Sequence, residues 1–363
     1  VDTFTDYGLF TQIEQGNELF LKTHGLDQNG NLYKANYFEF HTGITQLKNV
    51  DDPNYDAAKF DEILGIGAGR NHLKLLQMIS DVNNGALDID KVLDKHFCRD
   101  NYFAWLAFNI LVGNYDTQTQ NYYLYSPHDS LTWYFLPWDY DGSMVYRQFK
   151  DVEGNPAQLI GVANYWSNIL HSRVFQQEHN LNELNQKLDE LYNILGKGAV
   201  DALVARYQPL IEQYYLNNPG FSQEFTAAEF YENLDTIRAI VQHNYELYYA
   251  SIEKPMPIFL GETEATTDGT SFFWSQSFDL QGDRISYTLQ ISKNSRFTDL
   301  VYTKSRLTAT TFTVALEPGE YYWRVFITDS KGKSQRAFDV YWENATDRNI
   351  HTGIYGIRKT NVE

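Results

Sequence analysis

The sequence is poor in the residues that build disulfide frameworks and zinc sites. It has one cysteine, Cys98, in 363 residues, which excludes an intramolecular disulfide and a zinc site with several thiolates. Its nine histidines show no H-x-x-x-H pair, and no G-x-S-x-G elbow is present. These absences argue against a zinc hydrolase and against a serine hydrolase. No apolar run approaches the roughly 18 residues of a membrane helix, so no membrane span is predicted.

Basic residues are also scarce, with 29 Lys and Arg against 47 Asp and Glu and a net charge of −18. The imbalance lies in the first part of the chain: residues 255–363 carry 13 acidic and 12 basic residues, which leaves 34 acidic and 17 basic in residues 1–254. A surface of this sign repels nucleic-acid phosphates, and no basic stripe offsets it, so no nucleic-acid partner is expected. It would attract a basic protein segment.

Aromatic residues are abundant, with 27 Tyr, 23 Phe and 7 Trp, and this composition excludes a disordered chain. The length favours two domains. The pattern changes at Lys254–Pro257: long helical periods dominate before it, and short strands rich in Thr, Tyr, Phe and Val follow it. We therefore expect an α+β protein with a helix-rich part followed by an all-β domain.

In the first part, apolar periodicity predicts helices at residues 17–24, 57–64, 71–82, 88–97, 102–112, 181–194, 199–215 and 226–251. Strands are predicted at residues 7–15, 31–40, 121–125 and 131–136, with the last two joined as a hairpin by residues 126–130. Gly113 is suited to cap the buried helix before it. The glycine-rich Gly65–Arg70 is interpreted as a connector between helices, because it lacks the context of a phosphate-binding loop.

In the second part, strands are predicted at residues 271–275, 285–292, 299–304, 310–315, 320–328 and 335–342, the spacing of an antiparallel sandwich. Trp274, the run Tyr287–Ile291 and the run Leu316–Val325 resemble a fibronectin type III domain, a variety of immunoglobulin-like sandwich. In that resemblance Trp274 packs between the sheets, and Tyr322, six residues after Leu316, is the candidate for the tyrosine that ties a corner. Such modules are usually spacers or docking surfaces.

Three polar residues form the strongest chemical pattern. Asp116 follows the buried helix, Asn121 comes five positions later, and Asp139 follows the predicted hairpin. Protein kinases place an Asp, an Asn five residues on and a metal-binding Asp after a short β-hairpin in this order. In phosphoryl transfer one carboxylate accepts the hydroxyl proton, while an amide oxygen and a second carboxylate hold magnesium. The spacing alone leaves open that Asp116 caps a helix and that Asp139 is a turn residue.

Several stretches resemble the CotH family, the spore coat protein H-like atypical kinases of bacteria and some fungi. They are YGLFTQIEQ (7–15), LYKA (32–35), NYDTQTQNYYLY (114–125) and FLPWDYDGS (135–143). The resemblance spans most of residues 6–145. It implies that Asp116 is the catalytic base, that Asn121 and Asp139 are metal ligands assisted by Asp141, and that the cofactors are ATP with Mg²⁺ or Mn²⁺.

Further residues are candidates for holding the nucleotide. Trp133 lies six residues before Asp139 on the predicted strand, so both are expected on one sheet face, and Tyr33 could oppose it across an adenine. Lys34 could supply a charge, and Glu14 could position a phosphate-binding lysine. The alternatives are that both aromatic rings belong to the core and that Glu14 is an exposed strand residue. Only six residues precede Tyr7, so we expect the first lobe to be incomplete in this chain.

We therefore predict a partial kinase-like domain at residues 1–253, mostly the helix-rich second lobe with short β-hairpins, a fibronectin type III-like sandwich at 254–345 and a tail at 346–363. The predicted activity is metal-dependent transfer of the ATP γ-phosphoryl group to Ser or Thr of a protein, with a basic, Ser-rich segment suited to the acidic surface. The family resemblance implies a secreted, cell-surface or spore-coat protein. One alternative is an inactive scaffold at such a surface. Another is a carbohydrate-processing protein with two carboxylates roughly 5–9.5 Å apart.

Overall fold

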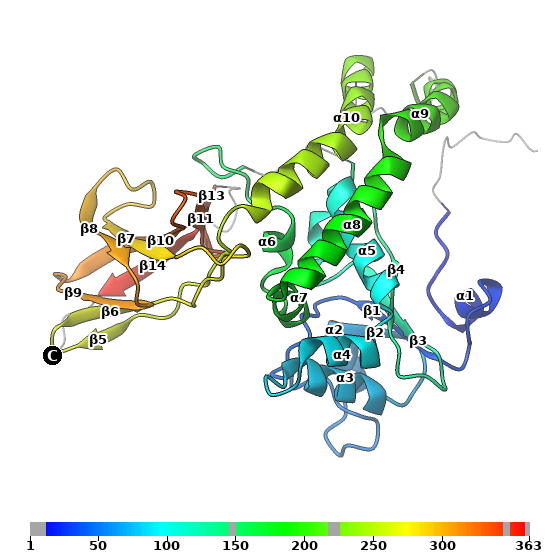
Figure 1. Ribbon diagram of the computed structural model, residues 1–363, viewed down its shortest axis with the longest axis horizontal. Coiled ribbons are helices and arrows are strands. Elements are labelled where there is room, and N and C mark those ends of the chain that lie inside the picture. Colours follow the sequence, from blue (N-terminus) through cyan, green and yellow to red (C-terminus); the bar gives the residue numbers. More distant parts are fainter. Residues whose placement is uncertain (1–11, 145–149, 217–225, 344–348, 360–363) are drawn as a thin grey trace, which may run out of the picture. The chain divides into compact units, whose positions relative to one another are not determined.

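The computed structural model describes residues 12–144, 150–216, 226–343 and 349–359 of the chain (Figure 1). The chain divides into two compact units. The first, which we call the helical unit, comprises Val1–Tyr146 and Ser167–Leu247, and the second, the sandwich unit, comprises Arg147–Trp166 and Tyr248–Glu363. Compared with the predicted domains, residues 147–166 and 248–253 group with the sandwich rather than with the helices.

The helical unit contains one antiparallel sheet in the order β2-β1-β3-β4. Its strands are β1 (Asn31–Ala35), β2 (Leu64–Ala68), β3 (Tyr122–Ser126) and β4 (Tyr134–Pro137). The interpretation of Gly65–Arg70 as a helix connector is wrong, because this segment contributes β2. Its glycines admit a close neighbour instead: a Cβ at Gly67 would lie 2.8 Å from the carbonyl oxygen of Gly16.

Helices surround this sheet (Figure 1). They are α1 (Glu18–Thr23), α2 (Ala57–Ile63), α3 (Leu73–Asn83), α4 (Ile89–His96), α5 (Arg99–Val112), the 3₁₀ helix η1 (Tyr115–Gln118), α7 (Ile169–Phe175), α8 (Glu178–Leu195), α9 (Lys197–Ile211), the π-helix η2 (Glu212–Leu216) and α10 (Ala227–Ile252), which ends in the sandwich unit. The helices predicted from periodicity are confirmed to within a few residues at each end. In the part of the chain that the structure describes, no helix combines the length and apolarity needed to cross a membrane.

The two faces of the sheet differ in what covers them. Alternation along β1 sends Tyr33 to one face, where its ring packs 5.9 Å from that of Phe60 in α2. Leu32 points to the other face and belongs to a small cluster that includes Leu21 of α1. Lys34 shares this second face, and its Nζ lies 5.5 Å from the ring centroid of Trp138. The sheet therefore separates a buried aromatic core from a thinner layer that carries Lys34.

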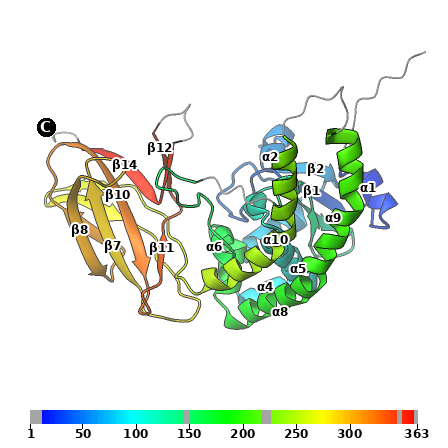
Figure 2. The same cartoon turned by 90° about the horizontal axis from the view of Figure 1, so that it is seen from above.

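The described part of the sandwich unit has two larger sheets and a two-stranded sheet of β12 and β13, and β11, β10, β7 and β8 lie side by side in one of the larger sheets (Figure 2). That sheet also includes β14, which pairs with β10, and the other larger sheet has the order β5-β6-β9. The elements of this unit are α6 (Val162–Tyr165), β5 (Glu264–Thr266), β6 (Gly269–Phe273), β7 (Ser286–Ser292), β8 (Leu300–Leu307), β9 (Thr311–Val314), β10 (Gly319–Thr328), β11 (Ser334–Arg336), β12 (Val340–Trp342), β13 (Ile350–Thr352) and β14 (Ile354–Lys359).

The core of the sandwich unit lies between the two larger sheets. Phe272 of β6 packs edge-on against Trp323 of β10, with ring centroids 5.1 Å apart, and the predicted packing of Trp274 in this core is confirmed. The fold class is thus α+β, a helix-rich part followed by a β-sandwich. Residues 350–359, which fall in the predicted tail, form β13 and β14 instead. The specific likeness to a fibronectin type III domain stays a prediction.

The tyrosine that ties the corner is Tyr321, not Tyr322 as predicted. The Tyr321 hydroxyl donates to the carbonyl of Glu317 at 2.8 Å, and its ring is buried. Residues alternate along β10, so Tyr322 faces away from the core, where its hydroxyl lies 3.4 Å from that of Tyr341. The prediction took the tyrosine six residues after Leu316, and that residue lies on the face of β10 that points away from the core.

Candidate functional site

The loop that carries Asp116 begins where α5 ends. Gly113 closes this helix with φ 67°, and a Cβ here would lie 2.8 Å from Nδ2 of Asn244 in α10. A side chain at this position would be strained and would also collide with its neighbour. Asn244 is buried and donates from Nδ2 to the carbonyl of Leu111 at 3.0 Å. The point at which the chain leaves α5 for η1 is therefore fixed by α10.

Asp116 and Asn121 are in direct contact. Nδ2 of Asn121 donates to Oδ2 of Asp116 at 3.0 Å. The backbone N–H of Asn121 donates to the carbonyl of Ala35 at 3.3 Å, which ties the loop to the end of β1. Asn121 has φ 62°, a left-handed backbone that is uncommon outside glycine and that persists only where the surroundings impose it. The predicted pair is thus brought together by an unusual turn at the start of β3.

The second pair of carboxylates follows β4. Asp139 also adopts a left-handed backbone, with φ 58°, two residues after the strand ends. The segment then folds back toward α5, because the N–H of Met144 donates to the carbonyl of Val112 at 2.7 Å. A Cβ at Gly142 would lie 3.9 Å from Oδ1 of Asp116. The Asp139–Gly142 turn therefore lies directly beside Asp116.

The charges of the site act on one another. The pKa of Asp139 is raised, first by partial desolvation, then by the charge of Asp141 and a hydrogen bond with it, and also by Asp116. Lys34 acts in the opposite direction and lowers it. Asp116, Asp139 and Asp141 are all exposed to solvent. Three accessible carboxylates and one ammonium therefore share a small region at the edge of the sheet, and the excess negative charge favours a cation there.

The donor set fits a hard divalent cation. Asp139 and Asp141 supply carboxylate oxygens, and Asn121, whose Nδ2 is engaged by Asp116, presents its amide oxygen. Oxygen ligands of this kind are those that Mg²⁺ and Mn²⁺ use in phosphate chemistry. A divalent cation bound to Asp139 and Asp141 would reverse the repulsion between charges that helps to raise the pKa of Asp139.

Lys34 is the one candidate nucleotide contact that lies with the carboxylates. It stands over the ring of Trp138, which in turn packs edge-on against Tyr123 at 5.1 Å. Sequence reasoning missed Trp138 as a part of this layer. The signal in the sequence was its position next to Asp139, whereas the register that pairs Lys34 with Tyr123 and Tyr123 with Leu136 is given by the structure alone.

The structure does not bring Trp133 and Tyr33 to the carboxylates. Both side chains are fully buried on the opposite face of the sheet, with ring centroids 5.9 Å apart. The Tyr33 hydroxyl is within 2.7 Å of Nδ1 of His72. The shared face predicted for Trp133 and Asp139 is wrong, because β4 ends at Pro137 and the left-handed turn at Asp139 breaks the alternation. Their contact with adenine stays a prediction that this burial argues against.

Glu14 lies just before α1. Its carboxylate is 2.8 Å from Nε2 of His24 and accepts a hydrogen bond from Thr23 at 3.0 Å. These partners explain the lowered pKa of Glu14, with the His24 contact first among the causes. The partners that the structure gives this residue therefore belong to α1. The start of the predicted strand at 7–15 lies outside the described residues.

Comparison with known proteins agrees with this geometry. No curated protein was found to match the chain significantly. Residues 1–248, which contain the whole carboxylate cluster and the strands that position it, match the sequence model of the family described as CotH kinase protein. Since this match covers more than half of the 363 residues, the chain belongs to the CotH kinase family.

Proposed function

We propose that the chain is a metal-dependent protein kinase that transfers the γ-phosphoryl group of ATP to a Ser or Thr hydroxyl. The observation that carries the proposal is the convergence of Asp116, Asn121 and Asp139 at one exposed point, although up to 23 residues separate them in the sequence. Family membership supports a kinase or kinase-like protein. The convergence supports the finer reading, because phosphoryl transfer depends on positioned carboxylates and cations.

Each side chain has a role that its surroundings suit. Asp116 is exposed and held on one oxygen by Asn121, so its other oxygen can face a substrate hydroxyl. As the hydroxyl oxygen bonds to the γ-phosphorus, the bond from that phosphorus to the β,γ-bridging oxygen breaks, ADP leaves, and the hydroxyl proton passes to Asp116. Asn121 keeps the carboxylate oriented through this step.

The cation and nucleotide have candidate partners in the same region. Asp139, Asp141 and the amide oxygen of Asn121 would hold Mg²⁺ or Mn²⁺, which when bound neutralises charge on the phosphates. Lys34, between Trp138 and the acidic turn, is the candidate for an additional phosphate contact. The net negative charge of residues 1–254 supports a basic, Ser-rich acceptor.

The test is phosphate transfer from labelled ATP to a basic, Ser-rich peptide with MnCl₂ present. Asp116→Asn should lower the rate by about 10²–10⁴-fold, because it removes the proton acceptor while preserving size and the contact with Asn121. Asp129→Asn is the matched control, since the Asp129 side chain is 99% exposed in the hairpin loop. Equal rates for Asp116→Asn and the wild type would refute the proposal, and an inactive wild type with folded variants would favour the scaffold alternative.

A further inference from the structure

Three loops of the sandwich unit share the pattern D-x-x-G-x and the same local structure. They are residues 151–155, 279–283 and 329–333. In each, Oδ1 of the leading aspartate accepts the backbone N–H groups of the residues two and four positions on, at distances of 2.8–3.0 Å. The glycine of each loop has a left-handed backbone, with φ 85°, 74° and 82°. One carboxylate oxygen thus shapes the loop and the other, Oδ2, remains for a second partner.

In the first loop, protein groups supply that second partner. Oδ2 of Asp151 accepts a hydrogen bond from Oγ1 of Thr352 at 2.7 Å and another from Nδ2 of Asn155 at 3.1 Å. Asp151 is buried, and both of its oxygens are satisfied. In this loop, hydrogen bonds from protein groups alone satisfy the second carboxylate oxygen.

The other two loops lack this completion. Asp279 is 4% exposed and Asp329 is 6% exposed, so more than nine-tenths of each side chain is buried. Oδ2 of each is inaccessible and has no hydrogen-bond partner among the described residues. A buried carboxylate oxygen without a donor is costly, because it loses its hydration and gains nothing in return. Because the same carboxylate oxygen lacks a partner in both loops, one ligand that contacts both aspartates would satisfy them together.

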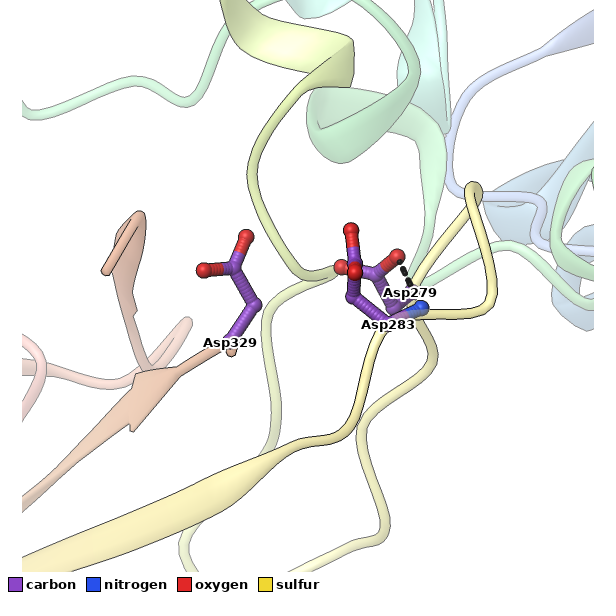
Figure 3. Close-up of side chains that lie close together, drawn as sticks. All are labelled: Asp279, Asp283 and Asp329. Atoms are coloured by element: carbon purple, nitrogen blue, oxygen red, sulfur yellow. Dashed lines mark hydrogen bonds between the residues drawn. The ribbon is translucent and has the colours of Figure 1, made fainter. Parts of the chain in front are cut away.

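The two aspartates with an unsatisfied oxygen lie near each other and near a third carboxylate. Ligand oxygens of Asp279, Asp283 and Asp329 all lie within 4.8 Å of one another, although Asp329 comes from the loop after β10 and the others from the loop before β7 (Figure 3). We propose that these three aspartates form a calcium site at this end of the sandwich unit. It lies in a different unit from the Asp116 cluster and does not depend on the proposed kinase activity.

Lys331 is the competing counter-charge. Its Nζ lies 2.8 Å from Oδ2 of Asp283, and its side chain is 55% exposed. The contact with Lys331, first among the causes, lowers the pKa of Asp283. Asp283 also accepts a hydrogen bond from Oγ of Ser330 at 3.1 Å. These contacts satisfy the carboxylate of Asp283 but leave Oδ2 of Asp279 and Asp329 without a hydrogen-bond partner among the described residues. The ammonium of Lys331 therefore does not neutralise all three aspartates.

The donor set favours calcium over the other common cations. All candidate ligands are oxygens, which excludes a preference for soft metals. The two inner carboxylates each have one oxygen fixed by their own loop, so both bind through a single oxygen in a geometry set by the backbone. Calcium accepts irregular arrangements of six to eight oxygens, whereas magnesium demands a near-ideal octahedron and retains its waters. Water can fill the remaining positions on the Lys331 side.

Amide hydrogen exchange of the full chain with and without CaCl₂ tests the site without any variant. At free calcium about 100 times the Kd, exchange in residues 279–283 and 329–333 should slow by up to about a hundredfold. Residues 151–155, which have the same loop with its carboxylate satisfied, serve as the internal control and should not change. Unchanged exchange in the two acidic loops would overturn the proposal. Equal protection by a lower concentration of MgCl₂ would overturn the assignment to calcium.

Calorimetry with CaCl₂ on variants identifies the ligands. Asp279→Asn with Asp329→Asn should abolish binding, whereas Asp268→Asn, an exposed aspartate of the same unit, should leave it unchanged. Asp139→Asn separates this site from the candidate kinase site and should also leave calcium binding at the sandwich unchanged. Lys331→Gln should tighten binding, because it removes the competing ammonium. Calcium binding that survives when the double variant is combined with Asp139→Asn, or that is lost at the sandwich in Asp139→Asn alone, would overturn the proposal.

Discussion

At the scale of single residues, Asp139 is held close to other negative charges in the candidate site, and this repulsion is unfavourable. Its backbone is left-handed and strained, and its neighbours Asp141 and Asp116 disfavour the ionised form of its side chain. Residues with such conflicts are frequent at functional sites, where a ligand relieves them. Partial desolvation is the first cause of the raised pKa of Asp139, and the repulsion by neighbouring charges is the part that a cation would reverse.

Asp139→Asn should therefore stabilise the metal-free protein at neutral pH. The pKa of Asp139 is raised on folding, so its favourable contribution exists only at low pH and is lost as the pH rises through the folded pKa. The asparagine removes the charge and keeps the shape. Thermal melts at pH 7.5 in EDTA measure the effect, with Asp129→Asn as the control. A lower Tm for Asp139→Asn than for the wild type would contradict this reading.

His171 makes the helical unit sensitive to acid. Burial lowers the pKa of His171 to about 3, and its Nδ1 lies 2.7 Å from the Tyr102 hydroxyl. Because the folded pKa is below the unfolded one, this contribution to stability is complete above the unfolded pKa and is lost as the pH falls toward 3. Between pH 7.5 and 4.5 the loss is on the order of 2 kcal/mol.

The test is urea unfolding at these two pH values. Replacing both partners, Tyr102→Phe with His171→Phe, removes the titrating group together with the hydroxyl that contacts it, and should reduce the decline by that amount. His72 and His96, whose pKa values are also lowered by burial, contribute to the decline that remains. The same decline in the double variant would show that His171 is not the acid-sensitive group.

Tyr321 tests the corrected assignment of the corner tyrosine. Tyr321→Phe deletes the hydrogen bond to the carbonyl of Glu317, which should lower the free energy of unfolding of the sandwich by about 0.5–1.5 kcal/mol. Tyr322→Phe loses only a hydroxyl contact of 3.4 Å with Tyr341 and should change the free energy of unfolding less. Chemical denaturation followed by near-ultraviolet circular dichroism compares the two. A larger effect for Tyr322→Phe would restore the original prediction.

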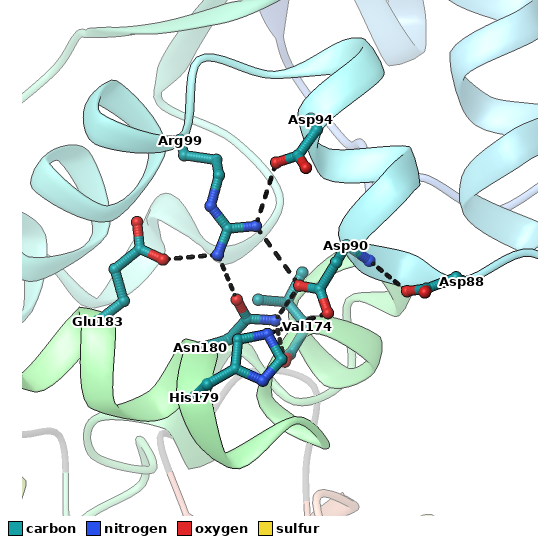
Figure 4. A network of polar contacts seen from close by, with 8 residues as sticks. All are labelled: Asp88, Asp90, Asp94, Arg99, Val174, His179, Asn180 and Glu183. Carbon is teal, nitrogen blue, oxygen red and sulfur yellow. Dashed lines mark hydrogen bonds and ion pairs between the residues drawn. The ribbon is translucent and has the colours of Figure 1, made fainter.

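At the scale of elements, a polar network joins α4, α5 and α8 (Figure 4). Arg99, at the start of α5, donates to Oδ1 of Asn180 at 2.6 Å and pairs with Glu183 at 2.5 Å and Asp90 at 3.4 Å. Asn180 is fully buried and donates in turn to Asp90 at 3.0 Å. The network fixes the direction of α5, and α5 delivers Asp116 to the site.

Arg99→Met should destabilise the helical unit by about 1–3 kcal/mol, because it leaves Asn180 and three carboxylates, Asp94 among them, without their common donor. The Arg99 side chain is 25% exposed, so solvent screens part of the effect. Arg206→Met is the control, since Arg206 is exposed on α9 and contacts only the ring of Tyr207 among the interactions described for it. Guanidinium chloride unfolding measures both. A loss no larger than that of the control would show that α5 is held by its apolar contacts alone.

The elements also show what the sequence could predict. Long helices were predictable because their apolar periods are regular, and Gly113 marked the end of α5 correctly. Strand β2 was not predictable from local pattern. Its Gly67 is explained by the close approach of the backbone at Gly16, which lies far away in the sequence. Burial of Trp133 in the core was one of the two alternatives, but its shared face with Asp139 was predicted wrongly, because the left-handed turn at Asp139 breaks an alternation that the sequence alone suggests. Local patterns were reliable, and features set by distant neighbours were not.

At the scale of the whole molecule, the two compact units carry different chemistry. The helical unit contains the Asp116 cluster, which the sequence predicted from spacing and family resemblance. The sandwich unit contains the Asp279 cluster, which no sequence pattern singled out because each of its loops is an ordinary D-x-x-G-x turn. Only the meeting of two such loops in space makes that cluster visible. Convergence in three dimensions therefore supports the first site and reveals the second.

The central claim is that Asp139 and its neighbours bind a metal–nucleotide complex. Isothermal titration of ATP into the chain, with and without MnCl₂, tests it most directly on the wild type, Asp139→Asn and the control Asp129→Asn. The account predicts manganese-dependent binding by the wild type and the control and none by Asp139→Asn, which the thermal melts would show to be folded. Equal binding by Asp139→Asn, or no binding by the wild type, would contradict it.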